Sequence, residues 1–226
     1  MILRSIALSL LLALASAAAS AEDSDGILAE TLLSDRDFFR LATCGAPPGG
    51  DCAGPTLRWR RSVITLAFLP DAVETPDGFA AHLDETLDHA IREINRSGAG
   101  LRIRRDDARG RAADIRVMPS LRLNGDIMTD EPGISAAGIM GVGYMTFWWN
   151  GRNEITEATI LISTAILPED MESVVLEEVF QTLGPRFDID GAAYEGVSIL
   201  SQTSNATTRI TGQDARLLRW LYPLRP

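Results

Sequence analysis

Apolar residues along the chain recur with two periods, one typical of strands and one typical of helices. Residues 63–69 alternate as a strand does, and short strands are expected at 101–104 and 114–118. Residues 78–95 instead place their apolar side chains at helical spacing. The pattern therefore predicts a strand, a long helix and further strands in this order.

The clearest pair of strands is a hairpin in the second half of the chain. Its arms are predicted at residues 144–149 and 154–164, with Asn150-Gly151 between them suited to a tight turn with positive φ. The second arm is apolar on both faces, which is typical of a central strand. The hairpin therefore predicts an antiparallel edge strand beside a central one.

Helices are expected on both sides of this hairpin and near the end of the chain. A long helix should start near Pro168, since proline is favoured in a first helical turn, and end at Gly184. Thr211 and Asp214 form a cap-like pair that opens a last helix, and the second half of residues 22–40 has an apolar helical face. The predicted class is mixed α/β (α+β): a sheet with an antiparallel edge strand, two long helices and a C-terminal helix.

The first residues predict export. Arg4 precedes an apolar run at residues 6–14, and Ala-Ser-Ala at residues 19–21 has the form of a signal-peptidase site. A membrane anchor is the alternative, but the run is shorter than the roughly 20 residues that a bilayer requires. We expect a periplasmic or secreted protein with no membrane span after signal cleavage. The expected parts are a signal peptide at 1–21, an N-terminal helical segment with a disulfide loop at 22–57, and a main domain at 58–226.

Charge narrows the possible partners. The 226 residues have a formal net charge of −10 and show no basic stripe. A chain of this charge is poorly suited to bind nucleic acid or an anionic membrane surface. We therefore expect no nucleic-acid partner.

The two cysteines, Cys44 and Cys52, enclose a short segment rich in proline and glycine. In an exported protein they meet an oxidising environment, and the compact turn brings their side chains together. We predict a disulfide between them. The alternative, a metal-binding pair, lacks a nearby histidine or a further cysteine.

The second long helix contains a pattern related to that of zinc peptidases. In the pattern H-E-x-x-H-x-x-G, two histidines one helical turn apart bind the metal, and the glutamate acts as general base. Here Glu177-Glu178-x-x-Gln181-x-x-Gly184 keeps the spacing, the glutamate and the glycine, but replaces both histidines. On its own, such a polar helical stretch is also typical of a solvated face.

Taken as an ordered set, these and other segments resemble a family of exported bacterial proteins, a domain of unknown function with a zincin-like or metzincin-like fold. The resemblance covers nearly the whole mature chain. It rests on residues 37–50, Glu177-Glu178-x-x-Gln181-x-Leu-Gly184, Asp188, Ser198-Ile-Leu200 and Asp214-x-x-x-Leu-Arg-x-Leu-Tyr222.

The resemblance implies a cleft lined by an edge strand at residues 143–149, before the central strand and the site helix. Tyr144, Trp148 and Trp149 of that strand are candidate binding residues. It also implies a turn beneath the site, in which Leu200 stands where a metzincin has methionine.

The metal ligands of a metzincin are missing. Its third histidine would fall at Phe187, and the two histidines of the chain, His82 and His89, lie on another helix, where a structural role is expected. Glu177, Gln181 and Asp188 offer only oxygen ligands, which suit Ca²⁺, Mg²⁺ or Mn²⁺ better than Zn²⁺. No cofactor is therefore assigned, although a divalent cation of unknown identity would be compatible with these three residues.

Three functions follow from these patterns. The leading hypothesis is a non-catalytic module of the cell envelope that binds a peptide or an exported protein by strand addition along residues 143–149. The alternative is a metal-dependent, peptidase-like hydrolase in which Glu178 is the general base, since two adjacent glutamates in a cleft raise each other's pKa. The third is a purely structural envelope protein. Activity as a zinc peptidase is not expected.

Overall fold

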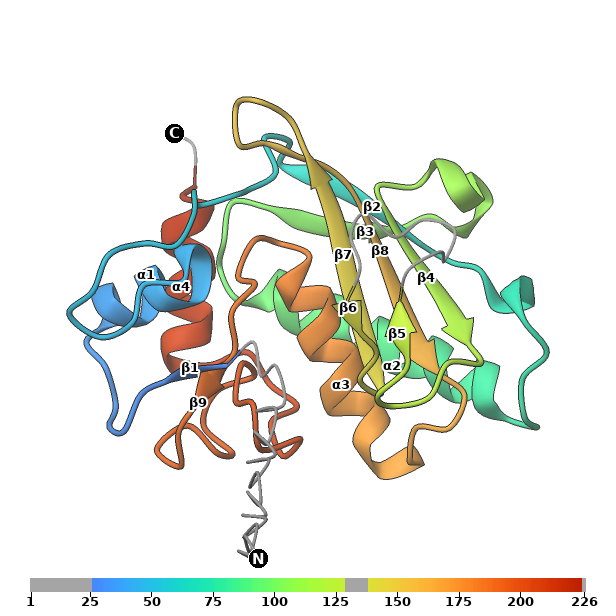
Figure 1. The fold of residues 1–226 in the computed structure, drawn as a ribbon. Coiled ribbons are helices and arrows are strands. Elements are labelled where there is room, and N and C mark those ends of the chain that lie inside the picture. Colours follow the sequence, from blue (N-terminus) through green and yellow to red (C-terminus); the bar gives the residue numbers. More distant parts are fainter. Residues whose placement is uncertain (1–25, 129–137, 225–226) are drawn as a thin grey trace, which may run out of the picture.

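The computed structural model describes residues 26–128 and 138–224, and its centre is one mixed five-stranded sheet (Figure 1). The predicted signal peptide, residues 1–21, lies outside the described residues. The sheet has the strand order β3-β2-β4-β8-β7. Its strands are β2 (Val63–Phe68), β3 (Arg102–Arg105), β4 (Ile115–Ser120), β7 (Gly143–Trp149) and β8 (Ile155–Ser163).

The direction of the strands separates the sheet into two parts. β2 is parallel to β3 and β4, and β4 is parallel to β8. β7 is antiparallel to β8 and ends the sheet within the described part of the chain. This arrangement confirms the predicted mixed sheet with an antiparallel edge strand beside a central one.

Two long helices pack against one face of this sheet, as the periodicity predicts. α2 (Phe79–Arg96) follows β2, and α3 (Pro168–Gln181) follows β8. Both helices contribute to one buried apolar cluster with the strands, and Leu83, Val175 and Ile160 are fully buried members of it. Burial of this face is the main source of stability for such a layer.

A second group of elements adjoins the helical side of the sheet. α1 (Asp35–Cys44) and α4 (Gly212–Leu221) lie side by side in Figure 1, and both pack into the same apolar cluster as the sheet. β1 (Ile27–Leu28) pairs in parallel with β9 (Ile189–Asp190). The N-terminal segment and the remainder of the described chain therefore share one core.

The remaining elements are short. β5 (Ile127–Met128) and β6 (Gly138–Ile139) form an antiparallel pair. Of two 3-10 helices, η1 (Pro70–Ala72) lies between β2 and α2, and η2 (Asp107–Ala112) lies between β3 and β4. Within the described ranges, no helix combines the length and the apolar character needed to cross a bilayer.

Three local details differ from the expectations. The first helix begins at Asp35, because Ser34 caps it by accepting a hydrogen bond from Asp37 N, and residues 26–34 are not helical. The hairpin loop extends to Glu154, and its positive φ, 59°, occurs at Asn153 and not at Gly151.

The third difference is at the last helix. Thr211 occupies the N-cap position, but its side chain makes no capping hydrogen bond. Asp214 turns into the core, where its carboxylate accepts hydrogen bonds from Ser198 Oγ at 2.7 Å and from Ile199 N at 3.0 Å. Asp214 therefore makes a tertiary contact, and the two residues do not form a capping box.

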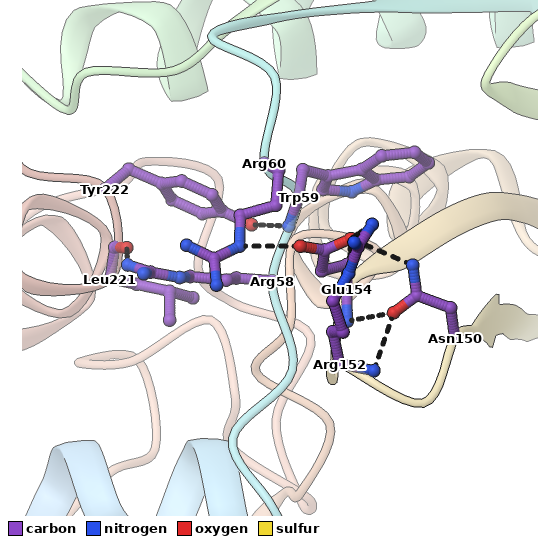
Figure 2. Close-up of polar contacts among 8 residues, drawn as sticks. All are labelled: Arg58, Trp59, Arg60, Asn150, Arg152, Glu154, Leu221 and Tyr222. Carbon is purple, nitrogen blue, oxygen red and sulfur yellow. Dashed lines mark hydrogen bonds and ion pairs between the residues drawn. The ribbon is translucent and has the colours of Figure 1, made fainter.

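The far end of the β7–β8 hairpin is fixed by a polar network (Figure 2). Glu154 lies between Arg60, whose Nε is 3.1 Å from Oε1, and Asn150, whose Nδ2 donates to Oε2 at 2.8 Å. Arg152 also donates to Oε2 at 3.0 Å. Beside it, Trp59 N donates to the hydroxyl of Tyr222 at 3.0 Å. These contacts tie the hairpin to the segment before β2.

Candidate functional site

A cleft of about 990 Å³ opens between the edge strand β7 and the C-terminal half of α3. One wall is the chain from Gly138 to Phe147, together with Trp149. The opposite wall consists of α3 and of polar residues from the segments that follow it, including Ser201 and Gln202. The cleft therefore runs beside the edge strand, where the resemblance places it.

The four polar residues singled out on and after α3 all line this cleft. Glu177, Glu178 and Gln181 come from the last turns of the helix, and Asp188 comes from the segment that follows. Glu178, Gln181 and Asp188 are each 8–9% exposed. The stretch is therefore not the solvated helix face that its polarity alone also allows.

Asp188 reaches the cleft because the chain turns back sharply after α3. Gly184 has a φ of +122°, and a Cβ there would meet the carbonyl oxygen of Leu57, so a side chain is excluded. Arg186 N then donates to Ala42 O at 2.8 Å, and β9 pairs with β1. These contacts direct Asp188 towards the helix that precedes it.

Gln181 and Asp188 meet directly at the floor of the cleft. Gln181 Nε2 donates a hydrogen bond of 2.6 Å to Asp188 Oδ1, and both side chains are buried. A hydrogen bond to a carboxylate is stronger than one between neutral groups. The contact therefore holds the end of α3 to the returning chain.

Glu178 lies against the backbone of the edge strand. A Cβ added to Gly143 would be 2.8 Å from Glu178 Cγ and 2.8 Å from Val174 Cγ1, and it would also collide with Glu178 Oε1. The absence of a side chain at Gly143 therefore allows α3 to approach β7 closely. Burial and the negative charge of Glu178 together raise the pKa of the nearby Tyr144 hydroxyl.

Of the three candidate binding residues on the edge strand, two line the cleft. Tyr144 and Trp149 are among its lining residues, and Trp149 is 49% exposed. Trp148 lies elsewhere, with Arg116 stacked over its ring at 5.7 Å. Trp149 lies two positions after Phe147, so both side chains share a face of the strand, and their rings meet edge to face.

Comparison with known protein families identifies the family to which the chain belongs. Residues 73–225 match the family described as "Protein of unknown function (DUF2927)". The chain belongs to this family. A comparison with curated proteins finds no match.

The DUF2927 domain does not bring histidine to the cleft. Phe187, which takes the position of a third metzincin histidine, lies over the disulfide loop, where a Cβ on Gly45 would be 2.7 Å from its Cζ. His89 Nε2 lies 2.7 Å from Thr208 O, and His82 Nε2 lies 3.1 Å from Pro168 O. Both histidines therefore connect α2 to other segments, as their structural interpretation predicts.

The predicted metal ligands of the DUF2927 domain do not form a carboxylate cage. Gln181 directs its amide nitrogen at Asp188, so this contact uses a donor and not a metal-binding oxygen. Within residues 26–128 and 138–224, no three His, Cys, Asp or Glu side chains gather closely enough to hold a metal ion. Cys44 and Cys52 form the predicted disulfide, which excludes the alternative of a metal pair.

Several residues of the DUF2927 cleft were not identified from the sequence, and two of them are Arg186 and Ser201. Arg186 lines it, and burial lowers the pKa of its guanidinium. Ser201 lies at the floor, 3% exposed, and reaches it through an isolated bridge to Ile189. Neither residue is part of a helical or strand repeat, so only the preceding glycine turn at Gly184 signals that this segment returns to the helix.

Proposed function

We propose that this domain is a non-catalytic module of the cell envelope that binds an extended peptide, or an extended segment of an exported protein, along β7. The order of edge strand, central strand and site helix agrees with the arrangement that a metzincin-like fold implies. The missing histidines separate it from an active zinc peptidase. In the absence of a zinc site, the cleft would bind the peptide without cleaving it.

The observation that supports strand addition best is the direction of the backbone groups of β7. Ser163 N donates to Val142 O at 2.9 Å, and hydrogen-bonded pairs alternate along an antiparallel ladder. The backbone groups of Gly143, Met145 and Phe147 therefore point away from β8, towards the cleft side of the strand. A peptide that pairs with them would extend the sheet by one strand, which is a common mode of peptide recognition.

The substitution Met145→Pro tests this proposal. Proline lacks the N–H that would bond the peptide, and an edge strand accepts proline where its N–H faces outwards. We expect the variant to fold but to lose binding of capped, β-forming heptapeptides, measured by calorimetry or fluorescence anisotropy. Thr146→Pro is the matched control, because the same ladder directs Thr146 N towards β8, so that variant should lose thermal stability. Unchanged peptide binding by a folded Met145→Pro protein would contradict strand addition.

Export is part of the proposal. The predicted signal at residues 1–21 places the domain in the periplasm or outside the cell, and the disulfide between Cys44 and Cys52 supports an oxidising compartment. Periplasmic fractionation of cells that express the full chain tests this expectation. Retention of the uncleaved chain in the cytoplasm would contradict it.

A second candidate is a peptidase-like hydrolase that uses oxygen ligands. The position of Glu178 beside the β7 backbone favours it, because a general base must lie close to the bond that is cleaved. Elemental analysis of the purified protein, combined with a peptide-cleavage assay of Glu178→Gln, tests it. Cleavage that requires a bound divalent cation and is abolished by Glu178→Gln would support this candidate over the binding module.

A further inference from the structure

The floor of the cleft holds a buried hydroxyl group that is not satisfied by the protein around it. Ser201 is 3% exposed and lines the cleft, and its Oγ has no hydrogen-bond partner in the part of the chain that the structure describes. Buried polar groups in folded proteins are almost always hydrogen-bonded. An unsatisfied hydroxyl on a residue that lines a cleft therefore indicates a place where a polar group of a ligand can bind.

The charged residues that line the same cleft are mostly acidic. Among the described residues that line the cleft, three carry carboxylates and one carries a guanidinium. The guanidinium, Arg186, is engaged elsewhere: Nη2 donates to Pro55 O at 3.1 Å, and its Cζ lies 5.0 Å from the centre of the Phe187 ring. The carboxylates are Glu177, Glu178 and Asp188. The floor is therefore a site of net negative charge in a partly desolvated environment, which favours a cation.

We propose that the cleft binds a cationic side chain of the peptide, lysine or arginine, between the carboxylates of α3 and the floor at Asp188 and Ser201. This inference rests on the proposed function, because it assigns a specificity to the strand-addition site. Ser201 Oγ would accept a hydrogen bond from the cation, and the carboxylates would balance its charge.

The geometry of β7 assigns the register of that side chain. In a β-ladder, directly opposed residues direct their side chains to the same face, with Cβ atoms about 4.5–5.5 Å apart. On β7 the face of Gly143 is the one that meets Glu178 and Val174. A peptide residue opposite Gly143 therefore directs its side chain towards α3, on the face where Glu178 packs against Gly143.

A host–guest series of peptides tests the inference. Capped heptapeptides of the form Ser-Val-Thr-Xaa-Thr-Val-Ser would carry lysine, norleucine or glutamate at Xaa, since norleucine keeps the length of lysine without its charge. We expect lysine to bind about tenfold more tightly than norleucine, which corresponds to about 1.4 kcal/mol, and glutamate to bind least. The lysine preference should shrink in Asp188→Asn and in Ser201→Ala.

The matched control is Glu169→Gln. Glu169 is an exposed carboxylate at the start of the same helix, outside the cleft lining, so the variant removes one negative charge without touching the site. Its lysine preference should equal that of the wild-type domain. A preference that falls equally in Glu169→Gln and Asp188→Asn would indicate long-range charge alone and overturn the assigned site.

The outcomes separate the two proposals. If lysine and norleucine peptides bind equally to the wild-type domain and binding is lost in Met145→Pro, strand addition stands and the cationic site is wrong. If no peptide of the series binds, both the strand-addition function and the cationic site are wrong. Tight binding of the lysine peptide that depends on Asp188 and on Met145 supports both.

Discussion

Gln181 on helix α3 donates a 2.6 Å hydrogen bond to Asp188, which follows a sharp return of the chain. Seven positions separate the two residues, and both are buried at the floor of the cleft. The bond therefore links the predicted helical motif to a segment that the helix period does not include. The position of Asp188 in the cleft therefore depends on the side-chain amide of Gln181.

The first prediction concerns this bond. Gln181→Met keeps the approximate volume of the side chain but removes the donor, so the buried carboxylate of Asp188 loses a stabilising contact. We expect a decrease of about 1–3 kcal/mol in the free energy of unfolding, measured by urea denaturation at neutral pH. The control is Gln202→Met, an exposed glutamine that also lines the cleft. Equal stability of the two variants would show that the bond contributes little.

The second prediction concerns the contact between the edge strand and α3. Gly143→Ala places a methyl group 2.8 Å from Glu178 Cγ and from Val174 Cγ1, so strand and helix must separate. Overpacking of this kind typically costs about 1–3 kcal/mol, measurable by urea denaturation. The cost should be smaller in a Glu178→Ala background, because truncation of Glu178 removes one of the two clashing groups.

Gly151→Ala is the control for that substitution. Gly151 lies in the hairpin loop, a Cβ there would meet no atom within 4 Å, and its φ is not in the left-handed region. Its stability should match the wild-type value to within about 0.5 kcal/mol, as for other surface substitutions. If Gly143→Ala is equally neutral, the close approach of α3 to β7 is not required.

The third prediction is a pH dependence of stability that originates at Asp214. Burial raises the pKa of this carboxyl from 3.8 to about 7, although hydrogen bonds from Ser198 and Ile199 lower it. The native state therefore binds the proton more tightly than the unfolded chain. The contribution of Asp214 to stability is complete below pH 3.8 and is lost as the pH rises to about 7.

Two variants isolate this contribution from the other titrating groups. The side chain that Asp214→Asn introduces cannot ionise. The difference in unfolding free energy between this variant and the wild type should therefore change between pH 4 and pH 7 and then level off. The two limits of this interval are set by the pKa of Asp214 in the unfolded and in the folded chain. Ser198→Ala removes a hydrogen bond to the ionised form and should move this change to higher pH. A difference independent of pH would contradict the raised pKa.

The fourth prediction concerns the hairpin end shown in Figure 2, where hydrogen bonds from Asn150 and Arg152 and the charges of Arg152 and Arg60 lower the pKa of Glu154. A lowered pKa means that the ionised form stabilises the fold above the usual value of 4.5 and that this stabilisation disappears as the pH falls. Glu154→Gln should therefore increase amide hydrogen exchange in residues 149–155 at pH 7, and this effect should shrink as the pH falls below 4.5 and through the lowered pKa. An effect that does not change with pH would exclude an ionic contribution.

The sequence predicts the helices and strands of the fold better than it predicts the long-range contacts between them. α2 is predicted to within one residue at each end, since its apolar side chains recur over 18 residues. Glu177 and Gln181 share a wall of the cleft because one helical turn separates them. Ser201 and Arg186 depend instead on long-range pairing of β9 and on the path through Ala42, which no local pattern encodes.

The two tryptophans of the edge strand show the same limit. In a regular strand Trp148 and Trp149 would face opposite sides, and the sequence does not show which of them would line the cleft. The packing of α3 against Gly143 decides this, because Trp149 shares a face with Phe147 and Gly143 whereas Trp148 lies beneath Arg116. The contact between Gly143 and α3 joins distant parts of the chain and is not visible in the pattern of β7 alone.

The position of Phe187 limits any attempt to rebuild a zinc centre in this domain. Replacing Glu177 and Gln181 with histidine would supply two ligands on one helix turn, but the third position turns towards Gly45 in the loop that the disulfide closes. An imidazole at residue 187 would also point towards Gly45 and not into the cleft. The phenyl ring of Phe187, which now fills the space over Gly45, would be lost. A designer would therefore have to re-route residues 185–188 and release them from the N-terminal loop, a change of backbone course that three point substitutions do not provide.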